Sequence, residues 1–270
     1  MSDLINHPAL DTYDERESPN VNKSLYKALL ILDCFTEATP EWGVTDLGRH
    51  LGIGKSSVST MLSTLADLNL VYQSPVTRRY RLGLRCLELG YVASSNILLR
   101  DYAFPILETL LKGSRIVYMA IPYQDSVLYI ETLFPIRRQV NFSSVGRRAP
   151  FYCTAIGKAM LANMPDHYID HYLKSIDFQP LTTNTITDAD RLSAELMRIR
   201  QQGFSLDHQE SELGIQCVGA PIRYNSGHVI GAISISGSPH EIDFSDVETL
   251  AHEVMDASRS IAQKVASSGY

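Results

Sequence analysis

One short stretch of the sequence gathers the side chains best suited to acid–base chemistry or metal binding, namely Asp207, His208, Glu210 and Glu212. Carboxylates and imidazoles transfer protons and bind divalent metal ions. If the stretch is a strand, however, Asp207 shares a face with Gln209 and not with Glu210, and no second histidine lies nearby. The pattern therefore favours a structural or solvent-exposed cluster, and we predict no metal site and no cofactor.

Two further patterns resemble reactive sites. Cys217 could act as a nucleophile with His208 as its base, but its apolar neighbours and the lack of a third orienting group favour a buried, unreactive thiol. The run Gly54-Lys55-Ser56 ends like a phosphate-binding loop, yet that motif requires a glycine at position 49, where this sequence has Arg49. We therefore predict no catalytic residue.

Charge is distributed unevenly along the chain. The whole chain has 24 Lys and Arg against 30 Asp and Glu, a formal net charge of −6, which argues against nucleic-acid binding over its entire surface. Residues 49–85, by contrast, hold six basic residues and one acidic residue, a net charge of +5. Such a cluster is typical of a surface that contacts phosphate groups, although a solvent-exposed face gives the same pattern.

The basic segment and the residues before it have the hydrophobic spacing of three helices. The first is expected over 24–35, and the second is a short helix with Thr45 as its N-cap. Two glycines then interrupt the pattern, and the outer face of the third helix carries Lys55 and a run of serines and threonines. A short helix, a glycine-containing turn and an amphipathic helix together indicate a helix-turn-helix.

Two strand-like runs, 70–73 and 78–82, follow the third helix, with a proline-containing turn between them. In the second run Arg79 and Arg81 are expected to share one face. A basic hairpin at this place is a wing, whose arginines could lie along a phosphate backbone or enter the minor groove. The residues predicted to contact DNA are Thr45, Lys55, Ser56, Ser57, Ser59, Thr60, Arg78, Arg79 and Arg81.

The remainder of the chain mixes helices and strands. Residues 84–99 are expected to form one helix that acts as a connector or a dimer face. Strands are expected over 116–121, 126–132, 137–142, 203–207, 217–224 and 229–236, and helices over 157–163, 165–173, 188–202 and 243–266. This mixture indicates an α+β domain on a largely antiparallel sheet.

The ends and the cysteines indicate a cytoplasmic protein. The first twenty residues lack a basic start followed by an apolar run, so they do not form a secretory signal. The longest run of aliphatic residues, at 28–32, has five residues, against the roughly 20 that a membrane helix needs. Four cysteines without paired spacing fit a reducing compartment.

Four parts of the sequence carry a family resemblance. They are DLGRHLGIGKSSVSTMLSTLADLNLVY at 46–72, YRLGLRCLELG at 80–90, VGRRAPFYCTAIGKAMLA at 145–162, and the combination of DHQESELGIQCVGAPI at 207–222 with GAISISG at 231–237. Together they resemble the IclR family of bacterial transcriptional regulators over about residues 22–265. The YxTAIGK form at 152–158 is similar to the branch that controls sugar-acid catabolism.

The resemblance implies an α+β protein in which a winged helix-turn-helix (21–83) is joined by a linker helix (84–100) to a GAF-like effector-binding domain (101–268), after a disordered acidic tail (1–20). It also implies a regulator, and we expect a repressor of a catabolic operon. As a homodimer, or a homotetramer, it would bind a pseudo-palindromic site in double-stranded DNA. We expect no membrane partner.

The same resemblance implies nine effector contacts, at Arg138, Asn141, Ala155, Ile156, Asp207, Ile215, Cys217, Ser234 and Ser236. Backbone N–H groups at residues 155–157 would begin a helix and attract an anion, and the two serines would reach one pocket from one strand face. The expected effector is a small carboxylate, either a sugar acid or a hydroxy or aromatic acid. Arg138 and Asn141 stand where several members have apolar residues and favour a polar ligand.

One departure concerns DNA readout. Thr60 stands where the family commonly has an arginine, so readout of guanine edges would give way to Ser and Thr contacts, the wing arginines and DNA shape. Two other functions remain as alternatives. An enzyme acting on a small acid through residues 207–217 lacks a general-base arrangement, and a sensor without DNA control would not need the helix-turn-helix.

Overall fold

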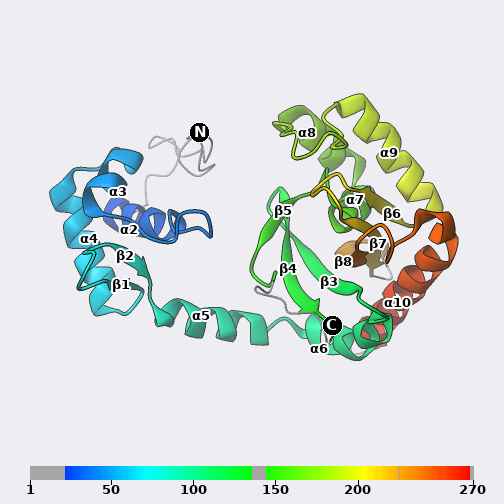
Figure 1. Ribbon diagram of the computed structural model, residues 1–270, viewed down its shortest axis with the longest axis horizontal. Coiled ribbons are helices and arrows are strands. Elements are labelled where there is room, and N and C mark those ends of the chain that lie inside the picture. The colour runs from blue at the N-terminus through cyan, green and yellow to red at the C-terminus, as the bar shows by residue number, and fades with distance from the viewer. Residues whose placement is uncertain (1–21, 136–143, 225, 268–270) are drawn as a thin grey trace. The chain divides into compact units, whose positions relative to one another are not determined.

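The computed structural model describes residues 22–135, 144–224 and 226–267, and the chain divides between Asn96 and Ile97 into two compact units (Figure 1). Each unit is described by itself. The strand expected over 137–142, with Arg138 and Asn141, lies outside the described residues.

The N-terminal unit is a helix-turn-helix followed by a two-stranded wing (Figure 1). Its elements are α2 (Lys23–Asp33), α3 (Val44–Leu51), α4 (Lys55–Asp67), β1 (Val71–Gln73), β2 (Tyr80–Leu82) and α5 (Leu84–Ser95). Apolar residues at helical spacing meet in one core, which includes Ile31, Leu47, Val58, Leu62 and Val71. Because α4 buries Val58, Leu62 and Leu65, its opposite face is left to solvent.

Three expectations for this unit are wrong in detail. Thr45 is not an N-cap, because α3 begins at Val44 after an extended Gly43. The strand expected from 78 begins at Tyr80, since Ser74 and Arg79 close the turn by a backbone hydrogen bond of 2.8 Å. The helix expected over 84–99 ends at Ser95, where the Asn96 side chain donates to the Val92 carbonyl at 2.9 Å.

The C-terminal unit is built on a six-stranded sheet with the order β5-β4-β3-β8-β7-β6, and all neighbouring strands are antiparallel. The strands are β3 (Ile116–Tyr123), β4 (Ser126–Leu133), β5 (Arg148–Pro150), β6 (Ser205–His208), β7 (Gln216–Arg223) and β8 (Val229–Gly237). The predicted antiparallel α+β architecture is confirmed. The short edge strand β5 was missed, because three residues give no alternation to detect.

Helices cover both faces of this sheet (Figure 1). One core joins the sheet to α6 (Leu98–Leu107), η1 (Glu108–Leu110), η2 (Phe244–Asp246) and α10 (Val247–Ser267). A second core joins the other face to α7 (Ala155–Leu161), α8 (Asp166–Ser175) and α9 (Ala189–Gln202). Successive side chains of β8 point to opposite faces of the sheet. Ile233 and Ile235 pack in the first core, whereas Ser234 and Ser236 face α7 on the other side. Among the described helices, none has the length and apolar character to cross a membrane.

Candidate functional site

A cavity of about 200 Å³ lies in the C-terminal unit between the sheet and the start of α7. Seven of the nine predicted effector residues line it, namely Ala155, Ile156, Asp207, Ile215, Cys217, Ser234 and Ser236. The other two, Arg138 and Asn141, lie outside the described residues. Residues from four separate parts of the sequence thus meet around one space.

The register of the sheet explains this convergence. Asp207 on β6 pairs with Cys217 on β7, and Cys217 pairs with Ser236 on β8, so the three lie in one row across three strands. Ser234, two residues along β8, pairs with Tyr118 on β3. Side chains in a row of paired positions point to the same face of a sheet, and here that face is the floor of the cavity.

The cavity also has lining residues that the sequence did not reveal. They are Tyr118, Tyr129, Ser144, Arg147, Arg148, Ala149, Thr154, Ser211 and Glu212. The rings of Tyr118 and Tyr129 lie 5.4 Å apart, and Arg148 is held in place by a 2.8 Å hydrogen bond to Ser126 Oγ and by the Tyr123 ring. The available signal was one tyrosine inside each of two neighbouring strands, Tyr118 in β3 and Tyr129 in β4. The sequence does not give the order of the strands, so it could not show that these two tyrosines face the same cavity.

Asp207 is buried beneath the cavity and already accepts two hydrogen bonds. Its Oδ1 accepts from the Glu210 N–H at 2.6 Å, and its Oδ2 accepts from the Ser211 hydroxyl at 2.6 Å. Burial raises the pKa of Asp207 above its ordinary value. Each oxygen retains a second lone pair, so the carboxyl group can accept from a ligand while it also shapes the loop that follows β6.

The first turn of α7 offers fewer donors than predicted. Thr154 caps the helix, and its hydroxyl accepts from the Gly157 N–H at 3.0 Å. Gly157 is therefore not available to an anion, and only the N–H groups of Ala155 and Ile156 keep the predicted role. The helix can come this near to the sheet because Gly219 has no side chain, since a Cβ atom there would lie 2.9 Å from the Ala155 carbonyl carbon.

Cys217 is a partly buried thiol that lines the cavity. It lies 3.2 Å from Ser236 Oγ, and burial raises its pKa far above the ordinary range. A protonated thiol is a poor nucleophile, which agrees with the interpretation that the sequence favours. Within the part of the chain that the structure describes, no group of three His, Cys, Asp or Glu side chains is placed to hold a metal ion.

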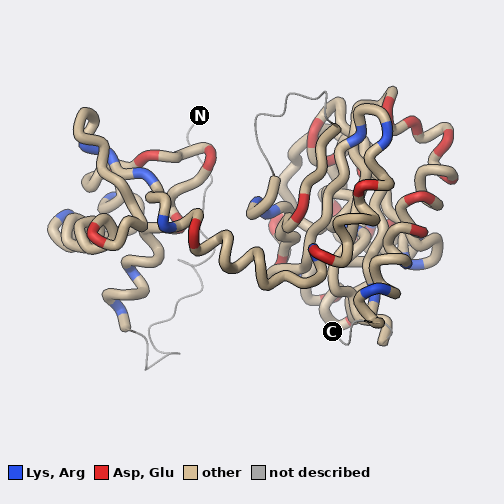
Figure 2. The backbone as a smooth tube through the Cα atoms, turned by 90° about the horizontal axis from the view of Figure 1, so that it is seen from below, with Lys and Arg blue, Asp and Glu red and all other residues tan. Residues whose placement is uncertain are grey.

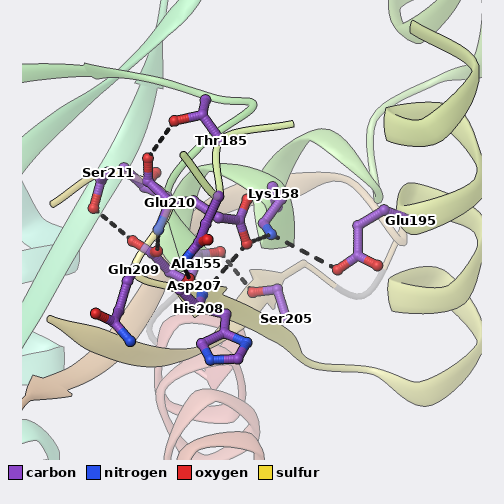
Figure 3. A network of polar contacts seen from close by, with 12 residues as sticks. Ala155, Lys158, Thr185, Glu195, Ser205, Asp207, His208, Gln209, Glu210 and Ser211 are labelled. Atoms are coloured by element: carbon purple, nitrogen blue, oxygen red, sulfur yellow. Dashed lines mark hydrogen bonds and ion pairs between the residues drawn. The ribbon is translucent and has the colours of Figure 1, made fainter. Parts of the chain in front are cut away.

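The acidic cluster found in the sequence is tied to a buried lysine (Figure 3). Lys158 on α7 is 1% exposed, and its Nζ donates to Glu210 Oε1 at 2.5 Å and lies 3.7 Å from Glu195 Oε1. The Glu210 carbonyl accepts from the Thr185 hydroxyl at 2.7 Å. Glu210 therefore joins α7, the segment before α9 and the Asp207 loop, and this member of the cluster has a structural role.

The outer face of α4 presents the predicted DNA-contacting side chains. Lys55, Ser56, Ser57, Ser59 and Thr60 are all exposed, because the inner face is fixed by its three buried apolar residues. Thr45 is exposed in the first turn of α3. Figure 2 marks the basic and acidic positions of this unit.

The wing separates its arginines into different environments. Arg78 is exposed at the turn, with a left-handed φ of 57°, and Arg81 lies over the Tyr72 ring at 5.0 Å. Arg79 turns inward, where it donates to the Glu41 carbonyl at 3.0 Å and pairs with Asp46 at 3.4 Å. The prediction that Arg79 and Arg81 share a strand face is wrong, because Arg79 precedes the strand.

Both units match models of one protein family. Residues 91–263 match the bacterial transcriptional regulator IclR C-terminal domain, and residues 24–75 match the IclR helix-turn-helix domain. The chain belongs to the IclR family. IclR regulators bind DNA, and the relatives of this chain are transcriptional regulators rather than enzymes, which is as predicted.

Individual IclR relatives resemble this chain over most of its length. The HTH-type transcriptional regulator KdgR of Escherichia coli K12 is 31% identical over 83% of this chain and 85% of its own length. The crystal structure of Thermotoga maritima IclR has a TM-score of 0.69 and 27% identity, and the match covers 90% of this chain and 99% of that one. An IclR homologue from Microbacterium hydrocarbonoxydans, solved with 4-hydroxybenzoate, has a TM-score of 0.76 at 21% identity over 90% of this chain and 99% of that chain, which supports the fold.

Proposed function

We propose that this IclR-family regulator represses a catabolic operon and responds to a sugar acid bound in the cavity of its C-terminal unit. The observation that carries the proposal is the composition of the lining, which combines hydroxyl groups from tyrosine, serine and threonine with two arginines and the buried Asp207. Hydroxyls and a carboxyl group suit a ligand with several hydroxyl groups, and arginine suits its carboxylate. A hydroxy or aromatic acid is the alternative, favoured by the two tyrosine rings.

The proposed mechanism is a change in DNA affinity. Two copies would present two α4 helices to successive major grooves of a pseudo-palindromic site, in the cytoplasm where that DNA lies. Effector binding would bias the relative placement of the two winged helices through the segment around α5, with a coupling of about 1–3 kcal/mol, or roughly 5–150-fold in DNA affinity. Fluorescence anisotropy on the DNA upstream of its own gene, with D-gluconate, D-galactonate or 4-hydroxybenzoate added, tests this. Unchanged DNA affinity with every acid would contradict it.

Removing both floor hydroxyls should weaken effector binding. With Ser234→Ala and Ser236→Ala, affinity for the acid that responds in the anisotropy assay is expected to fall about fivefold for each hydrogen bond removed, because each hydroxyl faces the cavity. Titration calorimetry gives this affinity. Ser258→Ala is the matched control, since Ser258 is equally buried but donates to the Pro221 carbonyl from α10 on the other side of the sheet. If the double serine variant and Ser258→Ala lost the same amount of effector affinity, the ligand would have to bind outside this cavity.

A homodimer is proposed from the apolar surface of α5. None of its residues is buried, and Leu84, Leu87 and Tyr91 are 79%, 72% and 72% exposed. Contiguous apolar side chains on a surface helix mark an interaction site. Sedimentation equilibrium of the full-length protein measures whether it forms dimers and whether the dimers pair into tetramers.

Charging this surface should therefore dissociate the dimer. Leu87→Glu with Tyr91→Glu is expected to give monomers in sedimentation equilibrium, because burying two carboxylates at an interface is strongly unfavourable. Glu88→Gln on the same helix, at a residue that is already polar and exposed, is the control and should leave the assembly unchanged. A double variant that sediments as the wild type does would exclude α5 from the interface.

A further inference from the structure

The base-reading face of α4 has an unusual chemistry for a DNA-binding helix. Between Lys55 and Thr60 its exposed residues are one lysine, three serines and one threonine, so no arginine or amide side chain is available for bidentate readout of a base. The N-terminal residues of a recognition helix are the ones that reach base edges. Apart from Lys55, which can donate to guanine, sequence discrimination by this part of α4 relies on hydroxyl groups or the threonine methyl group.

The threonine hydroxyl is already bonded within the helix. Thr60 Oγ1 donates to the Ser56 carbonyl at 3.1 Å, and Thr64 Oγ1 donates in the same way to the Thr60 carbonyl at 3.1 Å. A threonine that bonds back to residue i−4 has its side-chain torsion fixed. Its hydroxyl then points along the helix, and its methyl group is the part offered to the surroundings.

The neighbouring serines differ from Thr60 in two respects. Among the described residues, neither Ser57 nor Ser59 has a side-chain hydrogen-bond partner, so both hydroxyls remain available to phosphates or bases. Neither serine has a methyl group, and Val58 is buried in the core of the unit. Within the described residues 55–60, Thr60 therefore supplies the one exposed methyl group of the base-reading half of α4.

We propose that Thr60 is a specificity-determining residue that recognises thymine through its methyl group, and not a hydrogen-bonding replacement for arginine. The C5-methyl group of thymine projects into the major groove, where a threonine methyl group makes an apolar contact with it. The inference rests on α4 acting as the recognition helix. It implies that each half-site of the DNA contains a thymine whose methyl group meets Thr60.

Uracil-containing DNA tests the proposal, because uracil lacks only the C5-methyl group. Full-length protein first enriches duplexes from a random 30-base-pair pool, and the best duplex is then remade with dU in place of each dT in turn. For the wild type, dU at one position in each half-site is expected to weaken binding about fourfold, as expected for one buried methyl group. Thr60→Val keeps the methyl group and should keep this discrimination, whereas Thr60→Ser should bind dT and dU duplexes equally.

Thr64→Ser is the matched control, since Thr64 makes the same backbone hydrogen bond one turn beyond the base-reading end, and it should discriminate as the wild type does. Thr60→Val without discrimination, or Thr60→Ser with it, would overturn the assignment to the methyl group. A wild type that enriches duplexes but ignores every dU substitution overturns this inference alone. A wild type that enriches no duplex overturns the DNA-binding role of α4 and this inference with it.

Discussion

Replacing Lys158 by methionine is expected to lower the free energy of unfolding by about 3–5 kcal/mol. The side chain is 1% exposed, and its ammonium group is 2.5 Å from Glu210 Oε1. Methionine fills a similar volume but leaves the Glu210 carboxylate buried without its partner, which is the costly half of a broken ion pair. Urea denaturation followed by circular dichroism measures the decrease.

The double variant with Lys158→Met and Glu210→Met separates the pair from its packing. Replacing both members of a buried ion pair by apolar residues of similar volume is often neutral or stabilising, so most of the stability should be recovered. Arg115→Met is the control elsewhere in the unit, because Arg115 pairs with the partly exposed Glu253 at 3.0 Å, and its destabilisation should be much smaller. A double variant as unstable as the single one would show that Lys158 acts through packing and not through charge.

The same pair gives the Lys158→Met variant a pH dependence with a defined sign. Burial raises the pKa of Glu210 above its ordinary value, and removing the ammonium group raises it further. The folded variant then binds a proton more readily than the unfolded chain, so its stability rises as the pH falls towards the ordinary carboxyl range. The gap between the variant and the wild type should narrow in that direction.

Much of the fold could be predicted because its signals are local. The apolar spacing of α2 and α9 places both helices within two residues of their expected ends, and the strands β3, β4, β7 and β8 are long enough to be recognised. The break between α5 and α6 could not be predicted, because it depends on the Asn96 side chain bonding to the preceding turn. The three-residue β5 exists only because β4 is beside it.

The site was predictable only as far as a family motif could locate it. Seven expected residues share the cavity, but periodicity alone gives no reason to join β6 and α7. Lys158 illustrates the limit, since lysine is almost never fully buried without a partner, and its partner Glu210 is 52 residues away in the sequence. Arg79 is the reverse case, because its charge predicted a phosphate contact and its actual partners lie before and within α3.

Neutralising Lys55, Arg78 and Arg81 together as alanines is expected to weaken binding to every DNA sequence. All three side chains are exposed on the α4 and wing surface. Each basic side chain that meets a phosphate makes the slope of log affinity against log salt concentration more negative by about 0.9. Without these three side chains, the advantage of the wild type over the variant should shrink roughly 40-fold between 50 and 200 mM salt. Anisotropy titrations on specific and random duplexes at several salt concentrations measure both slopes.

Arg79→Ala is the control that the structure supplies, because it removes the same charge from the same wing. Its guanidinium group is bound to the Glu41 carbonyl and to Asp46, so the variant should lower the melting temperature of the winged unit and leave the salt slope nearly unchanged. If Arg79→Ala reduced the slope as much as Arg81→Ala does alone, the inward conformation of Arg79 would have to open on DNA. If the triple variant kept the wild-type slope, the α4 and wing surface would not be the one that contacts phosphate. The acidic residues elsewhere in the chain do not contribute to this salt dependence, since only basic residues that meet phosphates release counterions from the DNA.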